Sequence, residues 1–146
     1  MKGQSAAARM LEILHDIEER RIDRVLQSYH PEIEFHWPPG LPYSGVYKSS
    51  DMEEMNRRFG ATWLPLQPDE ETRRMNARVV ATDDNGRVIV KYLWKGLAAN
   101  GRRFQTETLA EYQVRDDRLL RAQMFYFDLT GMISFLEEVQ TALGRA

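Results

Sequence analysis

Apolar residues near the start of the chain recur every three or four positions, which is the spacing of an amphipathic helix. The first stripe consists of Met10, Ile13, Leu14 and Ile17. The second stripe follows the charged segment 18–21 and consists of Ile22, Val25, Leu26 and Tyr29. This pattern predicts two helices, or one bent helix, that end at Pro31, because a proline disfavours helical backbone in the residue before it.

After this helical region the pattern changes to one of strands and turns. Segment 32–37 alternates polar and apolar residues, which predicts a half-buried strand before the Pro- and Gly-rich loop 38–45. Ser50 and Glu53 form a capping box that opens a helix through Met52, Met55 and Phe59, which we expect to end at Gly60. Further strands are predicted at 75–82, 87–95, 104–115 and 119–128. The last helix carries the stripe Met132, Ile133, Leu136, Val139 and Leu143.

The order of these elements defines the fold class. Helices come first, then one strand, one helix, four consecutive antiparallel strands and a closing helix. This order predicts an α+β fold, because a parallel sheet would require strands and helices to alternate. We expect a single domain over residues 1–146, with an ordered core of about residues 8–143.

Composition and charge limit the partners of such a domain. Lys and Arg number 20 against 22 Asp and Glu, and the formal net charge is −2. This near-neutral balance argues against a nucleic acid or an anionic membrane surface as the main partner. The chain has no cysteine, which excludes disulfides and thiolate metal ligands. Arg9, Glu12 and Asp16 interrupt the N-terminal apolar stretch, and no apolar run is long enough for a membrane span, so we expect a cytoplasmic protein.

Several short phrases, in this order and spacing, resemble a known family. They are Tyr29-His30-Pro31-Glu32, Pro42-Tyr43-Ser44-Gly45, Asn100-Gly101-Arg102-Arg103-Phe104, and the stretch that runs from Tyr112-Gln113-Val114-Arg115-Asp116 to Phe125-Tyr126-Phe127-Asp128-Leu129. With them the chain resembles the nuclear transport factor 2-like superfamily and, within it, the SnoaL-like branch of polyketide cyclase-like and ketosteroid isomerase-like proteins. The resemblance implies a cone-shaped, curved antiparallel sheet wrapped around the N-terminal helices, with an apolar pocket for a small molecule. It also implies a homodimer that pairs through the sheet.

The resemblance places the catalytic positions of the family on this chain. The general base of the steroid isomerases corresponds to His36, whose neutral imidazole can accept a proton, and Glu34 shares its strand face and could orient the ring. Other acids of the family correspond to Ala110 and Phe125, which cannot donate a proton. Two functions therefore stay open: a cofactor-free isomerase, cyclase or hydrolase with His36 as base, and a non-catalytic ligand-binding or assembly domain.

Lys91 and Asp128 each have two interpretations. The family correspondence would turn Lys91 into the pocket, where it could hold an anion. Composition instead turns the more apolar alternate residues of its strand inward, and we favour this second interpretation; these residues are Val88, Val90, Tyr92 and Trp94. Asp128 ends the last strand, but it also precedes a helical stripe, where Asp is a preferred N-cap. We expect the cap.

A metal site is the weakest of the candidates. His30, Glu32, Glu34 and His36 would share one face of a continuous strand. Residues two apart in a strand are separated by about 6.6–7 Å, so four in a row do not converge on one ion. We therefore expect no metal and no other cofactor.

Aromatic residues are the best candidates for contacts with a ligand. A pocket built from them would favour a flat or cyclic apolar molecule. The alternative is that these rings fill the core or a dimer interface. The residues that we expect to bind the ligand are Trp37, Trp63, Tyr92, Trp94, Tyr112 and Phe125.

Overall fold

The computed structural model describes residues 5–144, and side chains as far as residue 141. Residues 1–4, which contribute to the expectation about the N-terminus, and the side chain of Leu143 lie outside this description. The helices are α1 (Ala6–Glu18), α2 (Ile22–Gln27), η1 (Ser49–Asp51), α3 (Met52–Trp63), η2 (Leu64–Leu66), α4 (Glu70–Arg73) and α5 (Leu129–Gly144), where η marks a single 3₁₀ turn. The strands are β1 (Tyr29–Trp37), β2 (Gly45–Lys48), β3 (Arg78–Thr82), β4 (Arg87–Leu97), β5 (Arg103–Arg115) and β6 (Arg118–Tyr126).

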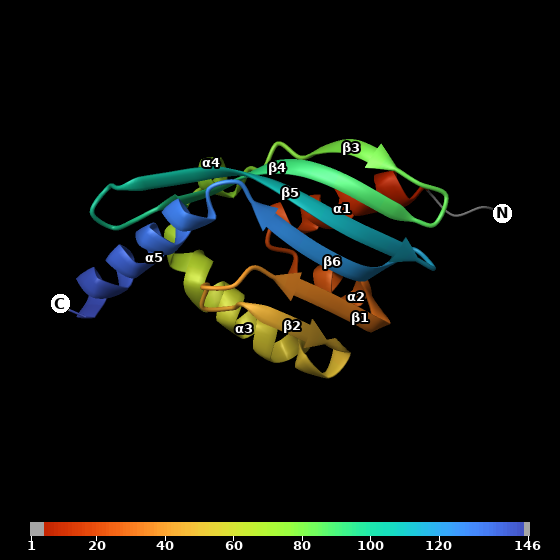
Figure 1. Ribbon diagram of the computed structural model, residues 1–146, viewed down its shortest axis with the longest axis horizontal. Coiled ribbons are helices and arrows are strands. Elements are labelled where there is room, and N and C mark those ends of the chain that lie inside the picture. The colour runs from red at the N-terminus through yellow and green to blue at the C-terminus, as the bar shows by residue number, and fades with distance from the viewer. Residues whose placement is uncertain (1–4, 145–146) are drawn as a thin grey trace.

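The six strands form one curved, unclosed sheet in the order β2-β1-β6-β5-β4-β3. Helices α1, α2 and α3 lie behind one face of this sheet, and α5 extends from one end of the molecule (Figure 1). The predicted α+β fold, with a curved sheet around the N-terminal helices, is confirmed. One detail differs, because β1 and β6 pair in parallel whereas all other neighbours are antiparallel. The last strand of the β3–β6 meander runs in the same direction as β1, beside which it lies.

The boundary between the second helix and the first strand differs from the prediction. Helix α2 ends at Gln27, and β1 begins at Tyr29, so that Pro31 lies inside the strand. The pairing of β1 with β6 is irregular between Tyr29 and Glu34. Pro31 is tolerated there, because a residue without an N–H group costs no ladder hydrogen bond at a bulge.

Two other predicted boundaries are each wrong by three residues. Helix α3 continues through Gly60 to Trp63. The strand predicted from residue 75 begins at Arg78, because Asn76 adopts a left-handed backbone with φ of 52°. Before that point, Met75 is held by a hydrogen bond from its N–H to the Glu18 carboxylate, at 2.6 Å. The short elements β2 and α4 were not predicted.

The face of β4 that the composition of the strand predicts to point inward does lie in the core. Val88 and Val90 are fully buried, and Tyr92 and Trp94 are nearly so. Lys91 lies on the other face, where its Nζ is 3.1 Å from Glu107 of β5. The interpretation from composition is therefore confirmed, and Lys91 does not reach the interior.

Helix α5 closes one end of the cone. Its first turn is capped by Asp128, whose carboxylate accepts a hydrogen bond of 2.9 Å from the Gly131 N–H, as expected. Phe135 of α5 packs close to Gly96 of β4, where a Cβ would lie 3.0 Å from the ring of Phe135 and 3.1 Å from Trp63. Glycine at position 96 thus allows helix and sheet to meet.

Within residues 5–144, no helix has the length and hydropathy that a membrane crossing requires.

Candidate ligand-binding pocket

A cavity of about 400 Å³ lies between the sheet and helices α1–α3. Helix α1 contributes the apolar stripe that the sequence predicts, and helices α2 and α3 contribute further lining residues. The strands contribute inward residues of β1, β4, β5 and β6, because successive side chains of a strand point to opposite faces. These strand residues are Tyr29, Phe35, Trp37, Tyr92, Trp94, Tyr112, Leu119 and Met124.

Phe59 of α3 is the centre of the ring cluster in this cavity wall. Its ring centroid lies 5.0 Å from Tyr43, 5.3 Å from Trp37 and 5.5 Å from Trp94. Trp63, one helical turn further along α3, packs edge-on against Trp94 at 5.6 Å. Such ring pairs hold one another in fixed orientations, so the wall is preformed rather than fluid.

A hydrogen-bonded chain of side chains lies behind this wall. The Trp63 indole donates to the Tyr43 hydroxyl at 2.8 Å, and the hydroxyls of Tyr43 and Tyr126 are 3.3 Å apart. Burial raises the pKa of Tyr43 and Tyr126 well above the usual value. Both phenols are therefore neutral at physiological pH.

Two further hydroxyls belong to residues that line the cavity itself. Tyr92 and Tyr112 influence each other's pKa, and burial raises the pKa of Tyr92 to about 12 and that of Tyr112 well above its usual value. Tyr29 donates to Asn56 at 3.5 Å, and burial raises its pKa to about 12. These neutral phenols are hydrogen-bond donors in a mostly apolar wall.

The opening of the cavity is marked by lining residues that are also exposed to solvent. Ile22 and Leu26 of α2 are 52% and 44% exposed, and Leu64 of η2 is 55% exposed. Glu53 and Arg57 of α3 line the same cavity and are exposed. The mouth therefore lies between α2 and the α3–η2 segment, with an apolar rim.

Five of the six predicted ligand-contacting rings line this cavity. They are Trp37, Trp63, Tyr92, Trp94 and Tyr112. The sixth, Phe125, is 49% exposed on β6, where its neighbours Met124 and Tyr126 are the inward residues. The prediction that Phe125 lines the pocket is therefore wrong by one position in the alternation of the strand.

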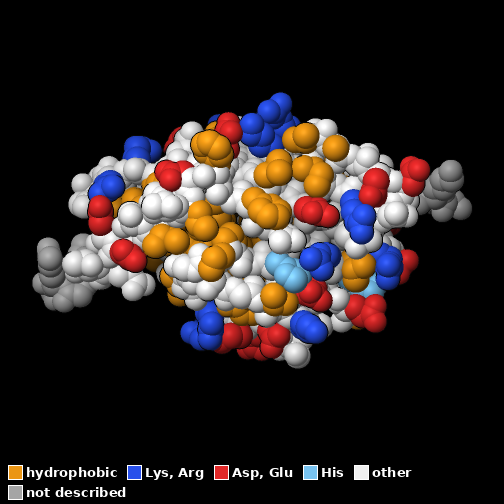
Figure 2. Space-filling model, in the orientation of Figure 1, with side chains coloured by type: hydrophobic (Ala, Val, Ile, Leu, Met, Phe, Trp, Pro, Cys, Tyr) orange, Lys and Arg blue, Asp and Glu red, His pale blue; other side chains and the backbone are white. Residues whose placement is uncertain are grey.

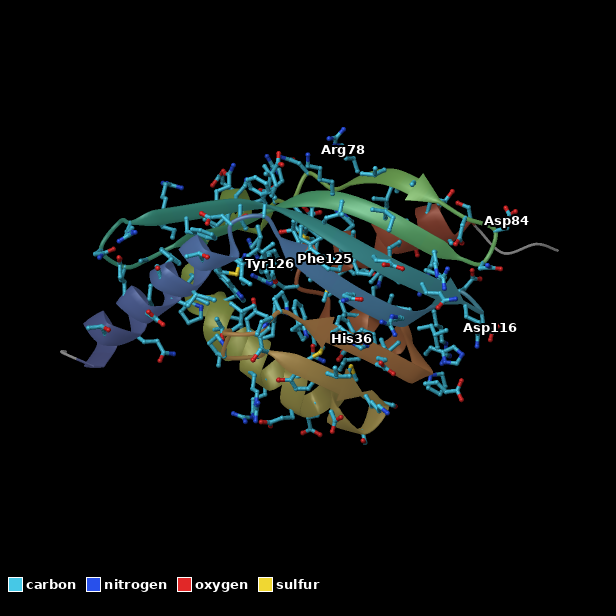
Figure 3. All side chains as sticks on the ribbon, viewed as in Figure 1. His36, Arg78, Asp84, Asp116, Phe125 and Tyr126 are labelled. Carbon is cyan, nitrogen blue, oxygen red and sulfur yellow. The ribbon has the colours of Figure 1, made fainter. Side chains whose placement is uncertain are left out.

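His36 lies on the face of the sheet opposite the cavity, here called the outer face (Figure 3). Glu34, two residues earlier in β1, lies on the same face. In β1 the inward residues are the odd-numbered ones, such as Phe35 and Trp37, so the even-numbered ones point outward. His36 Nε2 is 2.5 Å from the Glu34 carboxylate, which is also 3.7 Å from Arg121 of β6. The expected contact between His36 and Glu34 exists, but the prediction that His36 projects into the pocket is wrong.

Sequence reasoning missed the residue at the centre of the ring cluster. Phe59 was assigned only to the apolar stripe of a helix, as were Met52 and Met55. The signal was present, because Phe59 falls one turn after Met55 on the face that packs against the sheet. What was lacking was the position of that helix relative to the inward residues of β1 and β4.

The candidate metal ligands do not converge. Among residues 5–144, no three His, Asp or Glu side chains are arranged to hold an ion. His30 Nδ1 accepts a hydrogen bond from the Glu32 N–H at 3.0 Å, whereas His36 pairs with Glu34. The two histidines thus have separate local partners.

The sequence matches no protein-family model and no curated protein, but the fold matches solved structures over nearly the whole chain. A protein of unknown function with a cystatin-like fold from Xanthomonas campestris is 15% identical, with 91% of this chain and 98% of that chain covered and a TM-score of 0.75. An NTF2-like protein of unknown function from Burkholderia pseudomallei is 16% identical, with 92% and 98% covered and a TM-score of 0.73. TerC, co-crystallised with polyporic acid, is 17% identical, with 90% and 98% covered and a TM-score of 0.72.

These similarities define the class of protein by its fold. The chain has the NTF2-like fold, in which a curved sheet and its helices enclose a cavity. The fold that the sequence phrases predict is therefore confirmed. Since this fold serves many unrelated functions, the function must be argued from the cavity itself.

Proposed function

We propose that this protein binds a small, apolar, cyclic organic molecule in the cavity between the sheet and helices α1–α3. The observation that carries the proposal is the cavity of about 400 Å³ with its wall of aromatic rings, a size and lining typical of small-molecule sites. TerC, which has the same fold, was co-crystallised with polyporic acid, and this use of the fold is consistent with the proposal.

Polar groups in the wall narrow the chemistry of the ligand. Tyr92 and Tyr112, whose hydroxyls are neutral, line the cavity, and Trp37, Asn56 and Trp94 each have a buried side-chain N–H donor without a partner in the described part of the chain. An unpaired buried donor costs about 1–3 kcal/mol. These N–H groups are closed off from solvent and belong to residues that line the cavity. Donors without matching acceptors favour a ligand with carbonyl or other acceptor oxygens.

Binding without catalysis is the better supported of the two functions that the sequence left open. The described residues that line the cavity include no His, Asp or Lys, and their one carboxylate, Glu53, is exposed at the mouth. His36 lies on the outer face and does not reach a ligand in the cavity. An isomerase, cyclase or hydrolase with His36 as base would therefore have to hold its substrate outside the cavity.

Titration with the neutral fluorescent probe N-phenyl-1-naphthylamine tests the proposal. We expect saturable binding at one site per chain, with enhanced probe fluorescence and competition by polyporic acid. Phe59→Ala, which removes the central ring of the wall, should weaken binding about tenfold, by analogy with hot-spot aromatic residues. Phe127→Ala is the matched control, because Phe127 is 88% exposed and does not line the cavity. Equal effects of both substitutions, or no saturable binding, would contradict the proposal.

The outer face of the sheet supports a second part of the proposal, that two copies form a homodimer through it. Leu109 of β5 and Phe125 of β6 lie opposite each other in the register and are 42% and 49% exposed. Figure 2 shows hydrophobic side chains gathered over the middle of this face, among charged groups of both signs. Such a mixed surface can be complementary to a second copy of itself, as a two-fold interface requires.

Sedimentation velocity tests the homodimer. We expect the wild-type chain to sediment as a dimer and Phe125→Arg as a monomer, because the substitution places two like charges in the apolar centre of the interface. Leu11→Arg is the control, since Leu11 is 37% exposed but lies on helix α1, away from the outer face. A wild-type chain that is monomeric at every concentration would refute this part of the proposal.

A further inference from the structure

Arg20 has a backbone conformation that its residue type does not favour. It follows helix α1 with φ of 59°, while its N–H bonds to the Ile17 carbonyl and the Arg21 N–H bonds to the Asp16 carbonyl, the pattern of a helix C-terminal cap. Glycine is the usual residue at such a position, and other residues pay roughly 1–2 kcal/mol. The other described non-glycine residues with positive φ are Asn76, Asp116 and Asp117, which belong to the two types that tolerate it best. An arginine here is an outlier that its side chain should explain.

The side chain of Arg20 is half-buried and lines the cavity. Its guanidinium donates a hydrogen bond to the amide oxygen of Gln67, which is itself buried and held by a 2.9 Å bond from its Nε2 to the Lys95 carbonyl. This partner is neutral. A guanidinium has five N–H donors, so the bond to Gln67 leaves most of them available.

No acidic side chain neutralises Arg20 within residues 5–144. Burial lowers its pKa, and the nearby positive charge of Arg73 lowers it further, with no opposing carboxylate. Its neighbours differ in this respect, because Arg21 and Arg24 share Asp16 at 3.1 and 3.7 Å.

Arg57, the other arginine that lines the cavity, is also neutralised. It donates to the Glu54 carboxylate at 2.6 and 3.0 Å. Glu53 lies at the same mouth and is exposed to solvent on α3. Among the described residues, Arg20 is therefore the half-buried cation that lines the cavity without a counter-ion, next to the apolar rim of α2.

We propose that the ligand of this cavity is an amphipathic organic anion, whose oxyanion group binds the Arg20 guanidinium while its apolar ring system lies among the cavity rings. The inference rests on the proposed function and adds the charge and the orientation of the ligand. A planar guanidinium fork matches a carboxylate or a similar oxyanion, and partial burial strengthens that contact relative to one in water. The exposed apolar rim of Ile22, Leu26 and Leu64 would contact the body of the ligand just inside the charged group.

Two fluorescent probes that differ only in an anionic group test this inference. 8-Anilinonaphthalene-1-sulfonate has a sulfonate, whereas N-phenyl-1-naphthylamine is the same molecule without it. We expect the wild-type chain to bind the anionic probe more tightly than the neutral one. Arg20→Gln should lower the affinity for the anionic probe about tenfold or more, which is the size of a lost charged hydrogen bond. The affinity for the neutral probe should change less than about twofold. Arg20→Lys should restore part of the difference, because it keeps the charge but loses the fork.

The controls separate the role of Arg20 from charge in general and from folding. Arg24→Gln removes the same charge from a residue that does not line the cavity, and should leave both probes unchanged within about twofold. Arg20→Gly suits the left-handed backbone and tests the loss of the side chain in a second context, with thermal unfolding as the check that each variant folds. If Arg20→Gln weakens both probes equally or neither, the inference is refuted while cavity binding stands. If the neutral probe does not bind the wild-type chain at all, the proposed function fails and the inference fails with it.

Discussion

The indole N–H of Trp63 donates a 2.8 Å hydrogen bond to the hydroxyl of Tyr43, and both side chains are fully buried. The bond joins helix α3 to the loop after β1, so it fixes the helix that carries the central ring of the cavity wall. Tyr43 also meets Tyr126 of β6, which connects the same loop to the sheet. The wall of the cavity is thus tied together by polar contacts behind an apolar surface.

We expect Tyr43→Phe to destabilise the protein by about 1–3 kcal/mol, because it leaves the Trp63 N–H buried without an acceptor. Tyr126→Phe is the control, since Tyr43 keeps its bond to Trp63 in that variant and the loss should be smaller. Urea unfolding monitored by tryptophan fluorescence gives both values. Equal losses in the two variants would mean that the Trp63 bond is not the important one.

Alkaline pH should unfold the protein over a defined range. Burial raises the pKa of Tyr29 and Tyr92 to about 12, whereas tyrosines of an unfolded chain ionise near about 10. The folded state holds these protons more tightly, so the stabilisation is complete below about pH 10 and is lost as pH rises toward about 12. The urea midpoint should therefore fall across this range.

The matched variant for this pH effect is Tyr92→Phe, which should show a shallower fall in the urea midpoint because one buried phenol no longer ionises. Ultraviolet absorbance of phenolate should rise together with unfolding, not before it. If the buried tyrosines ionise while the protein is still folded, the assignment of their raised pKa to burial is incorrect.

The hydroxyls of Tyr92 and Tyr112 should distinguish ligands by their oxygens. We expect the double variant Tyr92→Phe/Tyr112→Phe to weaken the binding of 2-acetonaphthone by about 0.5–1.5 kcal/mol, the usual net value of a hydrogen bond. The binding of 2-ethylnaphthalene should stay unchanged. Titration calorimetry with the two compounds measures the difference. The same loss for both compounds would point to altered packing of the rings in place of a lost hydrogen bond.

Substitution of His36 should not affect binding in the cavity. Since His36 and Glu34 lie on the outer face, His36→Ala should leave the affinity for N-phenyl-1-naphthylamine within about twofold of the wild-type value. Trp37 is the next residue of the same strand and points inward, so Trp37→Ala should clearly lower the affinity for the same probe. A large effect of His36→Ala with no loss of stability would contradict the placement of His36 outside the cavity.

Much of the fold could be predicted from local patterns along the chain. The stripe of Met10, Ile13 and Leu14 faces the core, and the alternation of Val88, Val90 and Tyr92 does the same in β4. The cap at Asp128 also followed from residue type and position alone. These predictions succeeded because helix and strand periodicity and N-caps depend on neighbours close in sequence.

The candidate site was predicted only in part. Trp37, Trp94 and Tyr112 were correctly expected to line a pocket, but Phe125 and His36 were each placed on the wrong face of their strands. A shift of one residue reverses the face of every side chain in a strand. The correspondence with family positions was not accurate to one residue. Burial in the folded structure, in contrast, shows directly which face of the sheet each side chain occupies.

The amino-acid sequence by itself determined the α+β order of elements, the apolar stripes that face inward and the supply of aromatic rings for a cavity. The tertiary structure decided which rings meet around Phe59, that Arg20 lines the cavity with no acidic partner among the described residues, and that His36 lies outside. The physical reason is range: periodicity and capping are local properties, whereas a cavity depends on how α3 and the α1–α2 turn pack against strands distant in the sequence.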